Sequence, residues 1–290
     1  MIISVSGKIN SGKDTVGEIV QIISASPHFT DEAIVRFLGR PQLHPLWENK
    51  KFADKLKDMA CMLLGCSREQ LEDREFKEKE LGEEWWYWKI FGYNGTNPNG
   101  NFILIPYDNS EPDKYDKVAL IKSTPRLLLQ LLGTECGRQI IHPNIWVNAL
   151  MSEYKGVQIV FHEGDYIGKC KKCDTQMNGV DKRQTRCKKC CEEVLYPNWI
   201  ITDTRFENEL EVVKAKEGIT IGVNRPCNIC GGSGYHKMSC PVSKSGEHCS
   251  ETALDNAEFD YVIENEGELV DLVSKVREIM LKEGLWQEKQ

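Results

Sequence analysis

The stretch IISVSGKINSGKDTVGEIV, residues 2–20, decides the fold of this chain. Its short apolar run at residues 2–6 leads directly into the pattern G-x-x-x-x-G-K, from Gly7 to Lys13. A buried strand, a glycine-rich loop and a helix in this order form a phosphate-binding loop. We therefore expect a strand at residues 2–6, a helix at residues 13–24 and a nucleotide phosphate between them. The alternative is a glycine turn with a solvated lysine.

The residue types in this loop suit the binding of a polyphosphate. Gly7 and Gly12 let the backbone turn tightly enough for its N–H groups to face the anion. Lys13 can reach the β- and γ-phosphates, and the helix that follows offers the positive end of its dipole. The expected phosphate-binding residues are Gly7, Asn10, Ser11, Gly12, Lys13, Asp14 and Thr15.

The residue after the lysine departs from the usual motif. Ser or Thr normally stands there, and its hydroxyl binds Mg²⁺. In this chain the position holds Asp14, and Thr15 follows it. The carboxylate or the neighbouring hydroxyl can serve the metal, directly or through water. The sequence leaves the choice between them open and favours the kinases that tolerate G-K-D.

Composition and charge narrow the class of protein. The chain has 290 residues, a net charge of −7 and 40% hydrophobic residues, which is enough for one α/β core with insertions. The acidic balance argues against a broad nucleic-acid-binding surface. No apolar run approaches the roughly 20 residues of a membrane span, and the apolar start lacks the basic residues of a signal peptide. We expect a cytoplasmic protein without a membrane partner, whose twelve cysteines are reduced.

Strand-like and helix-like segments alternate along the rest of the chain. We expect a short strand leading into a helix within residues 50–65, helices at 123–140, 145–154, 207–218 and 268–282, and buried strands at 198–206, 219–226 and 260–265. Residues 25–50 suggest an irregular excursion, residues 67–90 a mostly helical segment and residues 102–106 a further strand. This alternation predicts an α/β fold with a doubly wound parallel sheet and helices on both faces.

Two charged residues stand at the end of a predicted strand. Asp203 lies at the carboxyl end of the strand at 198–206, where open α/β sheets bind their ligands. In phosphate-loop enzymes such an aspartate holds Mg²⁺ or its water, and the alternative is an N-cap for the helix that starts near Glu207. Arg205 faces the same rim, where it can clamp a phosphoryl group or form a surface ion pair.

Other candidates are less specific. Arg126 begins a helix after a Thr-Pro turn, and such an arginine can present its guanidinium to an anion. For Arg126, Arg138 and Arg225, ligand contact and a structural salt bridge are equally compatible with the spacing. The aromatic run at residues 85–88 can stack on a base, but packing in a core or lid is the more usual role.

Two insertions carry spacings that are typical of structural zinc. The first, residues 162–197, contains C-x2-C-x13-C-x2-C, with the expected ligands Cys170, Cys173, Cys187 and Cys190. The second, residues 226–249, contains C-x2-C-x5-H-x3-C, with the expected ligands Cys227, Cys230, His236 and Cys240. His248 or Cys249 is an alternative to His236. Four protein ligands close each site, so both Zn²⁺ ions should be structural.

Taken together, the motifs resemble the bacteriophage-type deoxynucleoside monophosphate kinases among the P-loop kinases. The segments that carry the resemblance are GKINSGKDT (7–15), FADKLKD (52–58), TPRLLLQLLGTECGR (124–138) with Trp146, ITDTRFENE (201–209), NRP (224–226), HCSETAL (248–254) and DYVIENEGELVDLV (260–273). The resemblance covers the core from end to end, without residues 90–115 and the two cysteine-rich insertions. It matches His248 to a family segment, which supports His236 as the zinc ligand.

The resemblance implies a P-loop kinase core over residues 1–290, with the second insertion at the position of a mobile lid. It implies transfer of the γ-phosphoryl group of ATP to a deoxynucleoside 5′-monophosphate, with Mg²⁺. The catalytic residues would be Lys13, Asp203, Arg205 and Arg126, and the acceptor side would hold Lys57, Arg126 and Arg138. A viral protein of this kind would work in the cytoplasm of its host.

Two rival functions stay open at this point. One is another small-molecule P-loop kinase, such as a dephospho-coenzyme A kinase. The other is a nucleic-acid-binding ATPase that uses its zinc ribbon as the reader, which the acidic net charge disfavours. The expected partners are small-molecule nucleotides, and a homodimer is compatible with the sequence.

Overall fold

The computed structural model describes residues 1–40, 46–91, 102–108, 118–155, 157–159, 193–226 and 253–287. The chain divides into two compact units. Unit 1 comprises Met1–Phe52 and Val147–Gln290, and unit 2 comprises Ala53–Trp146. Within the described ranges, none of the helices is long and apolar enough to cross a membrane.

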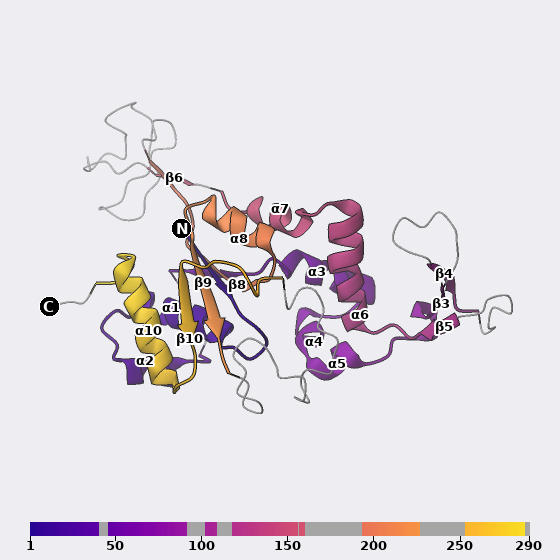
Figure 1. The fold of residues 1–290 in the computed structure, drawn as a ribbon, viewed down its shortest axis with the longest axis horizontal. Helices are drawn as coiled ribbons and strands as arrows, with labels where there is room; N and C mark the ends of the chain where they lie inside the picture. The colour runs from indigo at the N-terminus through magenta and orange to yellow at the C-terminus, as the bar shows by residue number, and fades with distance from the viewer. Residues whose placement is uncertain are drawn as a thin grey trace, which may run out of the picture. The chain divides into compact units, whose positions relative to one another are not determined.

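A five-stranded parallel sheet forms the centre of unit 1 (Figure 1). Its strands are β1 (Ile2–Ser6), β2 (Glu48–Lys50), β8 (Trp199–Thr204), β9 (Ile219–Asn224) and β10 (Tyr261–Glu264). They lie in the order β10-β9-β1-β8-β2, and every neighbouring pair is parallel. The three middle strands are buried along almost their whole length, as strands covered on both faces are. The predicted α/β fold with a parallel sheet is confirmed.

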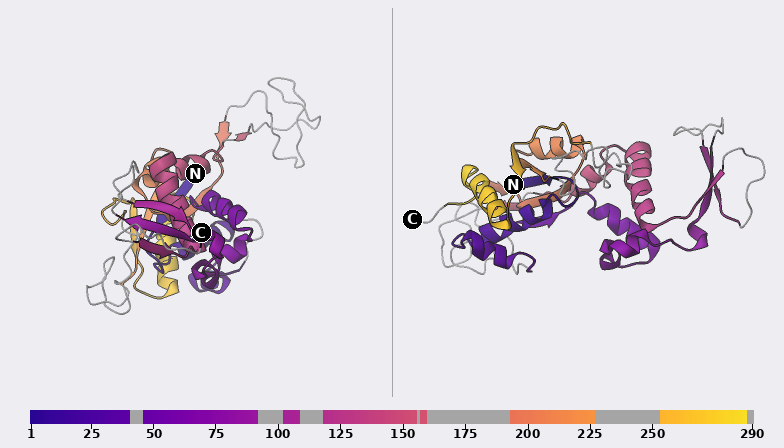
Figure 2. Two further views of the ribbon diagram at one scale, coloured as in Figure 1. Left: turned by 90° about the vertical axis from the view of Figure 1, so that its right-hand side faces the viewer. Right: turned by 60° about the horizontal axis from the view of Figure 1, so that its bottom comes forward.

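Helices cover both faces of this sheet (Figure 2). On one face lie α1 (Lys13–Ala25), α2 (Asp31–Phe37) and α10 (Leu269–Lys282), whose buried side chains share a core with β1 and β9. On the other face, α7 (Ile145–Met151) and α8 (Glu207–Lys214) contribute Val147, Leu150 and Val213 to a second core around Trp199. Each fully buried aliphatic side chain stabilises such a core by about 1.5–3 kcal/mol.

The contact between α1 and β8 is unusually close because α1 carries a glycine where it crosses the strand. A Cβ atom on Gly17 would lie 2.7 Å from Cγ2 of Thr202 and 3.1 Å from Cγ2 of Ile200. Only glycine allows this approach. It brings the first turn of α1 close to the end of β8.

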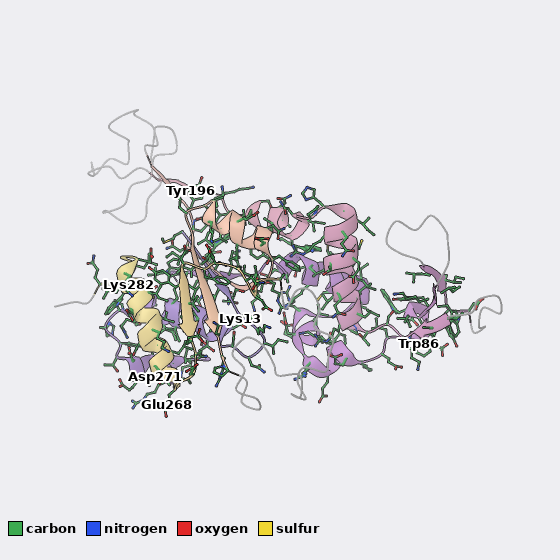
Figure 3. The ribbon with its side chains drawn as sticks, viewed as in Figure 1. Lys13, Trp86, Tyr196, Glu268, Asp271 and Lys282 are labelled. Atoms are coloured by element: carbon green, nitrogen blue, oxygen red, sulfur yellow. The ribbon has the colours of Figure 1, made fainter. Side chains whose placement is uncertain are left out.

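Charge complements the dipole of α10 at both of its ends. Figure 3 shows Glu268 and Asp271 together at the amino-terminal end of this helix and Lys282 at the opposite end. The backbone N–H of Glu268 donates to Oδ2 of Asp271 at 2.8 Å, so a carboxylate satisfies one of the donors there. Acidic groups at the start and a basic group at the end are the arrangement that the helix dipole favours.

The prediction of an irregular excursion over residues 25–50 was wrong for part of that range, because α2 forms within it. The hydroxyl of Thr30 accepts the N–H of Ala33 at 3.3 Å and caps the helix. Ile34 is fully buried, and Arg277 of α10 donates to Asp31 at 2.8 Å. A helix of seven residues depends on such tertiary contacts, which local sequence patterns do not report.

Unit 2 contains the helices α3 (Asp54–Leu64), α4 (Arg68–Glu72), α5 (Arg74–Glu78), η1 (Glu83–Trp85) and α6 (Pro125–Gln130). It also contains an antiparallel sheet with the order β4-β3-β5, formed by β3 (Tyr87–Phe91), β4 (Phe102–Pro106) and β5 (Val118–Ile121). The strand expected at residues 102–106 is confirmed. The helical prediction for residues 67–90 was wrong at its end, because β3 gains partners from two later segments.

The aromatic run at residues 85–88 packs within unit 2. The indole N–H of Trp86 donates to the carbonyl of Leu81 at 2.9 Å, and its ring lies 5.6 Å from that of Tyr107. Trp88 also approaches Tyr107, with ring centroids 6.0 Å apart. These contacts support the packing role that we weighed against base stacking.

The helix expected at residues 123–140 begins as α6 and continues as a π-helix, η2 (Leu131–Ile141). The indole N–H of Trp146 donates to the carbonyl of Gly133 at 2.8 Å. A Cβ atom on Gly137 would lie 2.9 Å from Cζ2 of Trp146, so the indole packs directly on the glycine backbone. The π-helical turns, which are wider than α-helical turns, coincide with this packing of the Trp146 indole. Turns of this kind often mark functional sites.

The eight cysteine and histidine residues expected to bind zinc lie outside the described residues. Two short strands, β6 (Val157–Ile159) and β7 (Glu193–Leu195), lie before and after the cysteine motif of the first insertion, and they pair in an antiparallel manner. Among the described residues, no cluster of three or more His, Cys, Asp or Glu side chains could hold a metal ion. The zinc assignment therefore stays a prediction from spacing.

Candidate functional site

The glycine-rich loop lies in unit 1 between β1 and α1, at the carboxyl end of the middle strand of the sheet. The N–H of Ser11 donates to the carbonyl of Lys8 at 3.1 Å, and the N–H of Val16 donates to that of Gly12 at 2.9 Å. Asn10 and Gly12 have positive φ angles of 63° and 97°. These turns start α1 directly at Lys13, which Figure 3 shows at this edge of the sheet.

Both motif glycines are required by close contacts. A Cβ atom on Gly7 would lie 2.4 Å from Oγ of Ser11 and 2.6 Å from the carbonyl oxygen of Val223. A Cβ atom on Gly12 would lie 2.6 Å from Nδ2 of Asn265. Neither glycine therefore leaves room for a side chain, and the structure identifies the groups that a side chain would displace.

Asn265, directly after β10, connects the last strand to the loop. Its side-chain amide donates to the carbonyl of Ser11 at 2.8 Å, and its backbone N–H donates to the carbonyl of Asn224 at 2.7 Å. Beside it is an open pocket of about 420 Å³, lined by Val35, Arg225, Asn265, Gly267, Glu268, Leu269 and Val270. Asn265 is therefore shared by the glycine-rich loop and this pocket.

Asp14 lies among three donors. Its Oδ1 accepts the hydroxyl of Thr202 at 2.6 Å and the ammonium of Lys51 at 3.3 Å, and its Oδ2 is 3.7 Å from Nζ of Lys13. Burial raises the pKa of Asp14, but the Thr202 hydrogen bond and the charges of Lys51 and Lys13 outweigh it, so the pKa falls below its usual value. An ionised carboxylate is an oxygen ligand of the kind that Mg²⁺ prefers.

Asp203 lies next to Thr202 at the end of β8. Between Ser4 and Ser6 the register of β1 against β8 shifts by one residue, so that Thr202 and Asp203 occupy the place of one. Such a bulge changes the direction in which side chains point. Oδ1 of Asp203 accepts the backbone N–H of Phe52 at 2.9 Å. A second carboxylate thus lies at this edge of the sheet.

The alternative role of Asp203 as an N-cap is wrong, because the N-cap residue of α8 is Phe206. The carboxylate of Glu209, 2% exposed, accepts the N–H groups of Arg205 at 2.7 Å and Phe206 at 3.2 Å. Glu209 therefore satisfies the donors at the start of this helix. By accepting the backbone N–H of Arg205, Glu209 also fixes the position of the arginine that we predicted for this rim.

The three residues expected on the acceptor side lie in unit 2. Lys57, on α3, is 2.6 Å from Oε1 of Glu72, and Arg126, on α6, forms an ion pair with Glu78. Arg138 lies in η2. For Arg126, the salt bridge that we weighed against ligand contact is present in this structure.

Three residues of the site were missed by sequence reasoning: Thr202, Lys51 and Asn265. A signal exists for two of them, since the carboxyl ends of parallel strands meet at one edge of a sheet. Thr202 precedes the predicted Asp203, and Asn265 directly follows the predicted last strand. Lys51 has no signal of this strength, because a lysine next to another lysine is common on surfaces.

Comparison with known proteins points to nucleotide kinases. No protein-family model matches the chain. Over 171 residues the chain is 25% identical to the deoxynucleoside-5′-monophosphate kinase of Escherichia phage T5. This match covers 51% of the chain and 60% of the phage protein, which is less than two thirds of that relative's length. The similarity supports a nucleotide kinase function in general terms.

Proposed function

We propose that this protein transfers the γ-phosphoryl group of ATP to a deoxynucleoside 5′-monophosphate and forms the two diphosphates. The observation that carries the proposal is the position of Lys13 at the start of α1, beside a carboxylate that Thr202 holds at the same edge of the sheet. The distant phage relative supports the choice of acceptor.

The reaction needs positioning and charge neutralisation more than proton transfer. An oxygen of the acceptor phosphate is already anionic, and it attacks the γ-phosphorus while the bond to the β,γ-bridging oxygen breaks. Lys13 and the N–H groups of the loop stabilise the charge on the phosphates, and Arg205 clamps the transferring group. On the acceptor side, Lys57, Arg126 and Arg138 bind the monophosphate.

The carboxylates of this edge fit the role of Mg²⁺ ligands. Asp14 is held ionised by its hydrogen bond from Thr202 and by two lysines, and Asp203 lies one residue further along β8. Either one would serve the metal directly or through water, with the hydroxyl of Thr15 as the alternative ligand. When bound, Mg²⁺ neutralises charge on the β- and γ-phosphates.

We further propose that the base of ATP occupies the pocket beside Asn265. Its volume of about 420 Å³ lies within the range of small-molecule sites. Because Asn265 also contacts the carbonyl of Ser11, a nucleotide in this pocket would lead its phosphates toward the loop. Arg225, which lines the pocket, would contact the base or the ribose.

The cysteine-rich insertions complete the proposal as structural elements. The Cys₄ set in residues 162–197 and the Cys₃His set in residues 226–249 each bind one Zn²⁺, which stabilises an insertion too small for a core of its own. The second insertion follows Arg225, where a lid would close over the phosphates and exclude water.

A panel of acceptors tests the proposal against its rivals. Purified protein is incubated with ATP and Mg²⁺ and with each deoxynucleoside monophosphate, each ribonucleoside monophosphate or dephospho-coenzyme A, and ADP is measured. We expect ADP formation with at least one deoxynucleoside monophosphate. Turnover of dephospho-coenzyme A alone, or ATP hydrolysis stimulated by DNA, would favour one of the rival functions.

The loop itself is tested by Lys13→Ala in the same assay. Loss of one preorganised electrostatic group lowers turnover by about a hundredfold or more. Circular dichroism checks that the variant is folded. Near-normal turnover in a folded Lys13→Ala protein would contradict the proposed function.

A further inference from the structure

We propose that Lys51 is a further phosphate-binding residue, whose ammonium binds the triphosphate of ATP beside Lys13. This inference rests on the proposed function. It follows from the place of Lys51 in the fold, from the carboxylate that it shares with Lys13, and from its contrast with the neighbouring Lys50.

The backbone holds Lys51 at the phosphate edge of the sheet. Lys50, the last residue of β2, pairs with Ile201 of β8. The N–H of Phe52 donates to Oδ1 of Asp203, and the ring of Phe52 is buried in the second core. The backbone of Lys51 is therefore held in place by the contacts of both neighbouring residues.

The ammonium groups of Lys51 and Lys13 approach the two oxygens of one carboxylate. Nζ of Lys51 is 3.3 Å from Oδ1 of Asp14, and Nζ of Lys13 is 3.7 Å from Oδ2. An anion that contacts both ammonium groups is attracted by two positive charges at once. The triphosphate expected at Lys13 is an anion of this kind.

The carboxylate of Asp14 does not depend on Lys51 alone for its position. Its contact with Lys51, at 3.3 Å, is longer than the 2.6 Å hydrogen bond that it accepts from Thr202. The side chain of Lys51 is 32% exposed, and its stem is flexible. A divalent cation at Asp14 would repel the ammonium and direct it to the phosphate oxygens.

Lys50 provides the matched control. Its Nζ is 3.3 Å from Glu48, 3.6 Å from Glu153 and 5.2 Å from the ring centre of Trp199. Its side chain is 26% exposed, close to the exposure of Lys51. The two lysines thus share residue type and strand end but have different partners.

Calorimetric titration with ATP tests the proposal on the full chain, in EDTA and then with Mg²⁺. Lys51→Met removes a charged hydrogen-bond donor and should weaken ATP binding by about tenfold or more. Lys51→Arg keeps the charge and should bind within about threefold of the wild type, and Lys50→Met within about twofold. Thermal unfolding confirms that the variants are folded.

The outcomes separate this inference from the proposed function. If Lys51→Met binds ATP as tightly as Lys50→Met while Lys13→Met loses binding, the role of Lys51 is refuted and the loop assignment stands. If the wild type binds no ATP, both proposals fail. Weak binding by Lys51→Met together with rescue by Lys51→Arg supports the inference.

Discussion

The side-chain amide of Asn265 donates a hydrogen bond to the backbone carbonyl of Ser11 at 2.8 Å, across 254 positions of the sequence. Both groups are buried. The bond ties the end of β10 to the loop at the point where the chain enters α1. Leaving a buried carbonyl without its donor costs about 1–3 kcal/mol of stability. The conformation of the loop therefore depends on a residue near the other end of the chain.

We expect Asn265→Ala to weaken ATP binding by about tenfold, because the Ser11 carbonyl loses its donor and the loop loses its preorganised shape. Calorimetric titration with ATP measures the effect. Asn224→Ala is the matched control, since within the described part of the chain its side-chain amide donates to the exposed Glu264 and not to the loop. Equal ATP affinities for the two variants would contradict a role of Asn265 in positioning the loop.

A second prediction concerns the charge network of Glu72 in unit 2. This carboxylate is 2.6 Å from Lys57, 3.2 Å from Arg68 and 3.5 Å from Lys77. Burial raises the pKa of Glu72, but the hydrogen bond and charge of Lys57, with Arg68 and Lys77, lower it to about 2. Its folded-state pKa thus lies below the value of about 4.3 in an unfolded chain.

The sign of the pH dependence follows from this depression. The network stabilises the fold above the unfolded-state pKa, and the contribution disappears as the pH falls from about 4 to about 2. Because the side chain is 45% exposed, solvent screening limits the effect to about 0.5–1 kcal/mol.

Urea denaturation at pH 7 and near pH 2 compares Glu72→Gln with the wild type. The variant should have a lower free energy of unfolding at pH 7, and most of the difference should be lost near pH 2, where Glu72 becomes protonated. Glu75→Gln, at an exposed position of α5, is the control. A difference that persists at the lowest pH would show that Glu72 acts through packing and not through its charge.

The zinc proposal predicts about two zinc ions per chain in freshly purified protein, by elemental analysis. Cys187→Ser should remove about one of them, because a tetrahedral site loses one of its four ligands. Cys61→Ser, on α3 and outside both motifs, should leave the zinc content unchanged. A wild-type protein without zinc would refute both insertions as metal sites.

Much of the fold was predictable because its signals are local. The apolar run at residues 2–6, the two loop glycines and the apolar stripe of the first helix lie within about twenty neighbouring positions. Buried strands such as residues 199–204 begin with a run of apolar residues, as strands of a parallel sheet do. For the same reason Asp203 could be assigned to a strand end from the residue pattern alone.

The wrong predictions share a cause. α2 is capped by Thr30 and packed through Ile34, but its stabilising partners lie on α10, more than two hundred residues away. β3 became a strand only because β4 and β5 pair with it. In both cases tertiary contacts outweighed the local sequence pattern.

The sequence by itself determined the glycine-rich loop between strand and helix, the α/β class, and the lysine and two carboxylates at positions 13, 14 and 203. Only the tertiary structure decided that Thr202 and Lys51 share Oδ1 of Asp14 and that Asn265 holds Ser11. The physical reason is that a loop's backbone conformation depends on neighbouring residue types, whereas hydrogen bonds between strand ends depend on strand order and register.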